Sequence, residues 1–91
     1  MSQPIFILKG TEAAAPTSSG TASNVSSARV VRCVNSGSTA RLVTLEESGG
    51  TDIGTLTVAG GESVLIHKDA TDKIFASNAE ILLTPVGIYQ G

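Results

Sequence analysis

The sequence predicts an all-β fold: a small antiparallel β-sandwich or jelly-roll-like barrel of about seven short strands, with an N-terminal strand or arm. Short runs rich in Val, Ile, Leu and Thr recur along the chain, and Gly-, Ser- and Asn-rich turns separate them. Their spacing of about 8 to 12 residues is typical of sandwiches and barrels. No long segment shows the apolar period of a helix.

The clearest β pattern lies in residues 42–66, where two glycine pairs, Gly49-Gly50 and Gly60-Gly61, separate three β-prone runs. Glycine accepts the positive φ that tight turns require, so we interpret both pairs as hairpin turns and the stretch as a three-stranded meander. A phosphate cradle is the other interpretation of such pairs. Neither pair belongs to a phosphate-binding glycine pattern that leads into a helix, which favours the turns.

The other strands follow from the same signals. Residues 29–35 end in the turn Asn35–Thr39, so we expect them to form a hairpin with residues 40–46. Pro85 predicts a sheet edge or a strand end for residues 80–86, because proline lacks a backbone donor. The expected strands are residues 4–9, 29–35, 40–46, 53–59, 62–68, 73–77 and 80–86.

Three regions are expected along the chain. Residues 1–10 form an N-terminal strand or arm, residues 11–27 a flexible linker rich in Ser, Thr and Ala, and residues 28–91 the all-β domain. The linker is expected because its segment has almost no large apolar side chains to offset the entropy of ordering. Pro16 limits any helix there to about one turn, too short to be stable alone.

Charge and length restrict the possible partners. The chain has 6 Lys plus Arg against 8 Asp plus Glu, a net charge of -2, and only 15% charged residues. We therefore expect no nucleic-acid partner and no membrane partner. A chain of 91 residues with one cysteine has a small core and no internal disulfide, which favours a homo-oligomer. Without a secretory signal pattern, we expect synthesis in a cytoplasm.

Candidate catalytic and metal-binding groups are few. Cys33 and His67, with Asp52, Asp69 or Asp72, contain the residue types of a Cys-His-Asp arrangement. Cys33 lies inside an apolar run, however, and the flanking motifs of cysteine nucleophiles are missing, so we expect a core or interface thiol. A single His without cysteine pairs predicts no zinc site, and the Asp69–Asp72 turn lacks the ligand pattern of a calcium loop. We expect no cofactor, no metal and no enzymatic activity.

Other polar groups carry little functional signal. Asn24-Val25-Ser26 matches a glycosylation acceptor, which we attribute to chance because no secretory signal accompanies it. Basic residues gather on the strands around 29–41 and acidic residues in the following loop. We interpret them as solvated charges, with pairing between copies as the alternative. These residues are Arg29, Arg32, Arg41, Glu46, Glu47 and Asp52.

The apolar run Ile5, Phe6, Ile7 and Leu8 is the candidate partner-binding site. A strand of this kind can add to a sheet edge of a neighbouring molecule by β-augmentation. It can equally pair within its own chain and complete the sandwich. The sequence leaves both arrangements open.

Residues 28–46, 53–64 and 68–77 resemble small virion structural proteins of tailed bacteriophages, particularly those that infect marine cyanobacteria. The likeness lies in strand order, in Ser/Thr/Gly-rich turns and in the pattern Lys-x-x-x-Asp-x-Ile-x-Ala-Ser at Lys68–Ser77. The resemblance implies a component assembled in many copies in the capsid decoration, neck or tail. It transfers no set of binding residues.

We therefore expect a non-enzymatic virion structural protein. The leading hypothesis is a capsid decoration (cement) protein that binds and stabilises the phage shell, with the major capsid protein or another virion protein as its partner. The alternatives are a neck or tail component and a carbohydrate-binding module. The last has only Phe6, Phe75 and Tyr89 as rings for stacking on a sugar.

Overall fold

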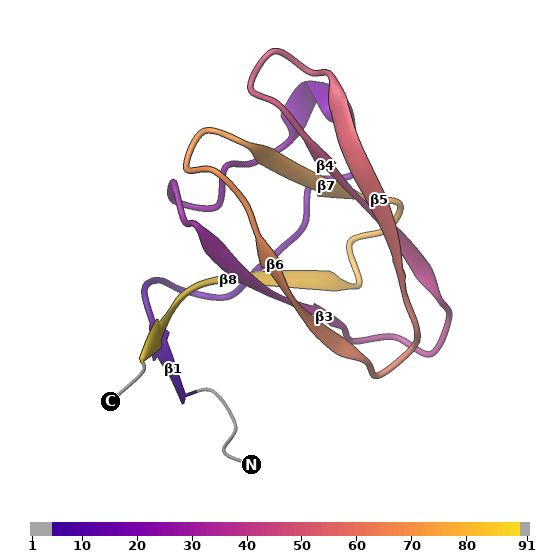
Figure 1. The fold of residues 1–91 in the computed structure, drawn as a ribbon. Helices are drawn as coiled ribbons and strands as arrows, with labels where there is room; N and C mark the ends of the chain where they lie inside the picture. The colour runs from indigo at the N-terminus through magenta and orange to yellow at the C-terminus, as the bar shows by residue number, and fades with distance from the viewer. Residues whose placement is uncertain (1–4, 90–91) are drawn as a thin grey trace.

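The computed structural model describes residues 5–89 and shows a sandwich of two antiparallel sheets (Figure 1), which confirms the all-β fold class. The described residues form eight strands and one short 3₁₀-helix. They are β1 (Ile5–Leu8), β2 (Ala13–Ala14), the 3₁₀-helix η1 (Ser19–Thr21), β3 (Val30–Asn35), β4 (Arg41–Glu46), β5 (Asp52–Val58), β6 (Ser63–His67), β7 (Lys73–Ala76) and β8 (Ile81–Tyr89). None of these elements is a helix long and apolar enough to cross a bilayer.

The larger sheet has the strand order β1-β8-β3-β6, and β2 also pairs with β8. The smaller sheet has the order β5-β4-β7. Along β3, side chains alternate between half-buried and buried, as expected for a strand with one face against a core. Val31 and Cys33 of β3 face Val43 of β4 across a core that the two sheets share.

The predicted three-stranded meander is only partly present. β4 and β5 form the expected hairpin around Gly49-Gly50, where Gly50 has a φ of +97°. The hairpin predicted between residues 29–35 and 40–46 is wrong, because β3 pairs with β6 and β8 in the other sheet. The prediction of a hairpin turn at Gly60-Gly61 is also wrong, because this turn carries the chain from β5 in one sheet to β6 in the other.

Pro85 does not lie at a sheet edge or a strand end. It stands opposite Val31 within β8, and β1 and β2 flank the other side of β8. On that side β1 ends at Leu8, opposite Val86, and β2 begins at Ala13, opposite Leu83. Pro85 therefore occupies the interruption between two short strands, where a missing donor costs no ladder hydrogen bond.

The core lies between the sheets and consists of small and medium aliphatic side chains. Its fully or almost fully buried members come from seven strands or loops. They are Ala15, Val25, Val31, Cys33, Val43, Val58, Ile74, Ala76, Ile81 and Leu83.

The sequence predicts a flexible linker at residues 11–27, whereas the structure packs this segment onto the sandwich. Ala15 and Val25 are buried in the core. The Ala15 amide donates to the Ile81 carbonyl at 2.8 Å, and the Ala76 amide donates to the Pro16 carbonyl at 2.8 Å. The segment attaches through backbone hydrogen bonds and small side chains, which a search for large apolar residues overlooks.

This segment ends in an unusual turn. Val25, Ser26 and Ser27 have φ values of 53°, 56° and 58°, in the left-handed region that favours glycine. Two side chains fold back to support the turn: Ser23 Oγ accepts from the Val25 amide at 3.0 Å, and Asn24 Oδ1 accepts from the Ser27 amide at 3.2 Å. The strained backbone directs the buried Val25 side chain into the core.

Candidate functional site

The four predicted partner-binding residues lie together in β1, which pairs antiparallel with the end of β8. The register runs from Ile5 opposite Tyr89 to Leu8 opposite Val86, so of the two arrangements that the sequence left open, pairing within the chain is observed. β1 and the end of β8 form a two-stranded ribbon beside the body of the sandwich (Figure 1).

The side chains of β1 remain exposed despite this pairing. Their exposed fractions are 61% for Ile5, 39% for Phe6, 41% for Ile7 and 71% for Leu8. The outer edge of β1 pairs with no other strand among residues 5–89. Four large apolar side chains on one uncovered strand are the kind of surface that marks an interaction site.

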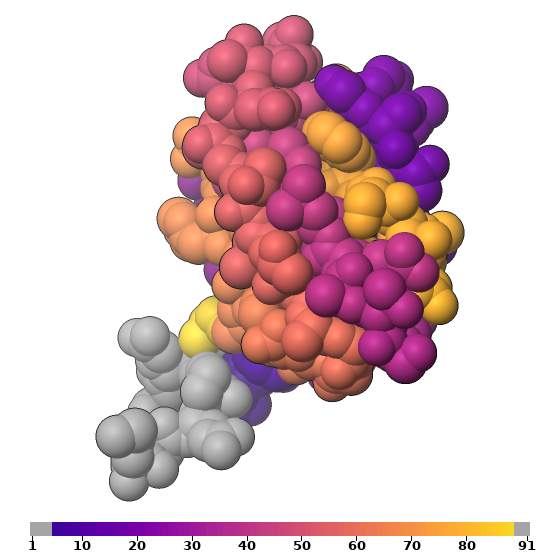
Figure 2. Space-filling view, turned by 90° about the vertical axis from the view of Figure 1, so that its right-hand side faces the viewer, coloured from indigo at the N-terminus to yellow at the C-terminus, as the bar shows by residue number. Residues whose placement is uncertain are grey.

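A second apolar surface lies between the two sheets, at the free edges of β5 and β6. These strands end their respective sheets and do not pair with each other. They diverge from the turn that joins them (Figure 1). In the view of Figure 2, β5 runs down the face of the molecule without another segment over it, and all its residues before Val58 are exposed.

Side chains from three strands line a hollow of about 180 Å³ between these edges. None of them is charged, and two of the contributors, Val43 and Leu45, belong to the interior strand β4. The sandwich is therefore open on this side. The lining residues are Val43, Leu45, Gly54, Thr55, Leu56 and Ile66.

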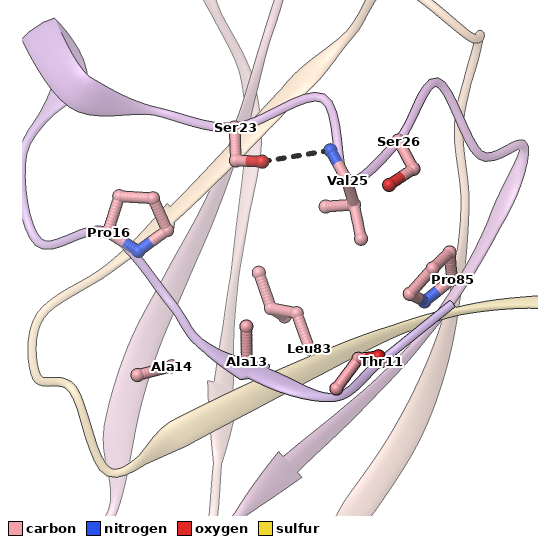
Figure 3. A pocket seen from close by; sticks show the side chains of 9 residues that line it. All are labelled: Thr11, Ala13, Ala14, Pro16, Ser23, Val25, Ser26, Leu83 and Pro85. Atoms are coloured by element: carbon pink, nitrogen blue, oxygen red, sulfur yellow. Dashed lines mark hydrogen bonds between the residues drawn. The ribbon is translucent and has the colours of Figure 1, made fainter. Parts of the chain in front are cut away.

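Another hollow, of about 200 Å³, lies between β2 and the left-handed turn (Figure 3). Its lining has no charged, aromatic or metal-ligating side chain, and the hydroxyl of Ser23 already accepts from the Val25 amide. Such a surface offers neither a nucleophile with a base nor a stacking platform. Its lining residues are Thr11, Ala13, Ala14, Pro16, Ser23, Val25, Ser26, Leu83 and Pro85.

The structure does not bring Cys33 and His67 into one catalytic arrangement. Cys33 is fully buried, and this burial raises the pKa of its thiol to about 11, so the thiol stays protonated near neutral pH. His67 is exposed at the end of β6, opposite Val30. The part of the chain that the structure describes contains no group of three His, Cys, Asp or Glu residues able to hold a metal ion.

Besides the Cys33 thiol, two charged side chains of residues 5–89 are buried, and sequence reasoning identified neither as buried. Glu46, interpreted above as a solvated charge, is 1% exposed, and Ser19 Oγ donates a hydrogen bond of 2.8 Å to its Oε2. That interpretation is wrong because the segment around η1 covers this end of β4. Lys68 is 3% exposed and its Nζ donates to the Asp69 carbonyl at 3.1 Å.

Burial and nearby carboxylates shift the pKa of Lys68 in opposite directions. Loss of hydration lowers the pKa of its ammonium group, and the negative charges of Asp72 and Asp69 counter this effect. The two aspartates also shape the turn itself, since the Asp69 amide donates to Asp72 Oδ2 at 3.1 Å. Their arrangement is that of a structural turn around a lysine.

One of the predicted basic residues is paired within the chain. Arg41 donates to Glu80 Oε1 through Nε at 3.0 Å and through Nη2 at 2.8 Å. Glu80 was not singled out in the sequence, and only the fold places it beside Arg41. Arg29 is exposed and Arg32 half-buried.

The aromatic residues form no platform for a sugar. Phe6 is exposed on β1, Phe75 is half-buried on β7, and the side chain of Tyr89 lies outside the part that the structure describes. Neither hollow has an aromatic side chain in its lining. No observation therefore favours the carbohydrate-binding alternative.

Comparisons with protein-family models, with curated proteins and with solved structures found no match to the chain. The class that the observations define is a small all-β sandwich with an exposed apolar strand on one side and an apolar hollow between two free sheet edges on another.

Proposed function

We propose that this protein is a non-enzymatic virion structural protein of a tailed bacteriophage, and that it acts as a capsid decoration protein. In this role it binds the outer surface of the shell through β1 and stabilises the shell by bridging neighbouring capsid subunits. The observation that carries the proposal is the exposure of all four apolar side chains of β1, at 39–71%.

Exposure of large apolar side chains to water is energetically unfavourable. An uncovered strand with four large apolar side chains is a liability in a free protein, and it becomes favourable when a partner covers it. Main-chain hydrogen bonds along the outer edge of β1 would supply affinity, and its side chains would supply specificity. The low charge of the chain, 15% charged residues, suits a contact based on apolar burial. The resemblance to cyanophage virion proteins supplies the identity of the partner.

The proposal is tested by binding to phage particles. Purified protein is mixed with purified tailed-cyanophage shells, and bound protein is measured after sedimentation. Ile5 and Ile7 alternate onto one face of β1, so the variant Ile5→Asp/Ile7→Asp should reduce binding at least tenfold. The matched control is Leu42→Asp, which changes a side chain of similar exposure (44%) on β4 and should bind as the natural protein does.

Circular dichroism and the urea midpoint establish that each variant is folded. Equal binding by Ile5→Asp/Ile7→Asp and the natural protein would reject β1 as the contact. Absence of binding to shells by the natural protein would reject the decoration role. Binding confined to the neck or tail, located by immunogold labelling, would replace decoration by one of those positions.

A further inference from the structure

We propose that the hollow between β5 and β6 receives strand β1 of a second copy of this protein, with the ring of Phe6 inserted between the two sheets. The contact is made by two different surfaces: the projecting apolar strand of one copy and the open side of the other.

The hollow has the size and lining for this side chain. A dry cavity of about 150 Å³ lined by aliphatic side chains is large enough to hold benzene. The hollow measures about 180 Å³ and its lining residues carry no charge. Phe6 is 39% exposed on β1, and it is the only exposed aromatic side chain among those that the structure describes.

Gly54 of β5 is a second feature of the hollow. It lies inside β5 and has no positive φ, and a Cβ atom built on it would meet no atom within 4 Å. Packing within the chain therefore does not explain its lack of a side chain. Glycine within a strand marks a bulge or a place where another backbone or a ligand approaches closely. The pairing of β5 with β4 shifts register between Asp52 and Gly54, and Gly54 also lines the hollow.

No other strand of residues 5–89 covers the edges around the hollow, although β5 has a register shift against β4 between Asp52 and Gly54. Natural proteins block free edges with lysine, proline or a covering segment. The edge of β7 is covered in this way, because Ala76 bonds to Pro16 and Ile74 bridges to Ser23. β5 and β6, by contrast, contain no Lys, Arg or Pro. These edges therefore offer no barrier to an apolar side chain of another copy.

Charge and geometry indicate which strand is added. β1 is followed by the exposed cation Lys9, and β5 begins with the exposed anion Asp52, so a strand β1 that runs antiparallel to β5 brings opposite charges to the same rim. Within one molecule β1 is already paired with β8, and the ribbon that they form lies beside the body of the sandwich (Figure 1). The strand that fills the hollow therefore comes from another copy.

The contact is compatible with shell binding. Phe6 and Leu8 lie on one face of β1, and Ile5 and Ile7 lie on the other. Insertion of Phe6 leaves Ile5 and Ile7 available to a different surface. Because the two partners contribute different surfaces, the contact is heterologous and repeats into a ring or an open chain. A single four-residue strand buries less than the roughly 1,200 Å² of a stable interface, so association in solution should depend on concentration.

The experiment is sedimentation equilibrium of the full chain over about a hundredfold range of concentration. The natural protein should increase in average mass with concentration. Phe6→Asp removes the inserted ring, and Gly54→Leu fills the hollow from within. Each should weaken self-association at least tenfold, whereas Leu42→Asp should associate as the natural protein does.

Mixing the two variants gives the sharper result. Phe6→Asp retains an intact hollow and Gly54→Leu retains an intact β1, so an equimolar mixture should form one-to-one pairs that neither variant forms alone. If Gly54→Leu fails to fold, Leu56→Asp replaces it, because Leu56 also lines the hollow and is 41% exposed. A natural protein that stays monomeric throughout, variants that associate normally, or a mixture without pairs would overturn the proposal. Shell binding by Ile5→Asp/Ile7→Asp is a separate measurement, so the two proposals can fail independently.

Discussion

The side-chain amide of Asn35 donates a hydrogen bond of 2.9 Å to the carbonyl oxygen of Val58 and thereby joins the last residue of β3 to the last residue of β5 in the opposite sheet. The same Nδ2 donates to the Thr39 carbonyl at 2.7 Å, and Oδ1 accepts from the Gly37 amide at 2.9 Å. Asn35 is fully buried. It closes the corner at which the chain leaves one sheet for the other.

Asn35→Ala should therefore destabilise the protein by about 2–4 kcal/mol, because it leaves a buried carbonyl and its neighbours without partners. Urea unfolding followed by circular dichroism measures this loss. The matched control is Ser36→Ala, which removes an exposed hydrogen bond of 2.7 Å to the Glu80 carbonyl and should cost less than about 1 kcal/mol. Equal effects of the two substitutions would contradict the role of Asn35.

Gly60→Ala should destabilise the protein by about 1–3 kcal/mol, a cost typical of overpacking. A Cβ atom at position 60 would lie 2.6 Å from the carbonyl carbon of Ser38, and a backbone cannot move aside as a side chain can. Gly49→Ala is the control, since its Cβ would meet nothing within 4 Å. Thermal unfolding should separate the two, and a Gly60→Ala variant as stable as Gly49→Ala would reject the close approach.

Ser26→Gly and Ser27→Gly should each stabilise the protein by about 0.5–1 kcal/mol. Both serines are exposed and have φ values of 56° and 58°. At such φ values the steric strain relieved by removing the Cβ is larger than the extra conformational entropy that glycine loses on folding. Differential scanning calorimetry measures the rise in Tm, about 4–8 °C per kcal/mol for a domain of this size. Ser63→Gly in β6 should instead lower Tm, and a drop in Tm for all three would reject the strain.

The Cys33 thiol should make stability fall at alkaline pH. Its pKa is raised by burial from 9.0 to about 11 in the folded state. Below pH 9 the thiol is neutral in both states, and its contribution to stability is fully present. Between about pH 9 and 11 the unfolded state loses the proton and the folded state keeps it, so about 2–3 kcal/mol is lost as pH rises.

The measurement is the difference in unfolding free energy between the natural protein and Cys33→Ala from pH 8 to 11. The difference is needed because Lys68, whose pKa is lowered in the folded state, acts with the opposite sign in an overlapping range and is common to both proteins. The stability advantage of Cys33 should shrink as pH rises. A constant difference would show that the buried thiol does not govern the alkaline loss.

The sequence was sufficient to predict the fold class and most strands, because alternating apolar residues and turn signals are local. It did not determine how strands pair. Cys33 lies opposite both Val64 and Leu83, and nothing near Cys33 in the chain indicates partners so distant. Gly60-Gly61 resembles a hairpin turn in composition, yet Asn35 accepts from the Gly61 amide at 3.0 Å and helps to turn the chain into the other sheet.

The candidate site was predicted only in part. Ile5–Leu8 stand out as an apolar run, and their shared strand follows directly. The hollow does not stand out, since Gly54 and Ile66 become neighbours only because β5 and β6 end different sheets. The burial of Glu46 depends on Ser19, 27 residues earlier, and no local pattern indicates that contact.

The order of the larger sheet also governs when the protein can fold. β8 lies between β1 and β3 and pairs with β2 as well. These three strands therefore cannot complete their pairing until β8 (residues 81–89), which is synthesised after them, has left the ribosome. Among the strands of residues 5–89, only β4 and β5 are both consecutive in the chain and paired. Pairing of residues so far apart slows folding. The complete sandwich therefore forms only after translation of β8, and until then the apolar residues of β1 and β3 lack the strand that lies between them.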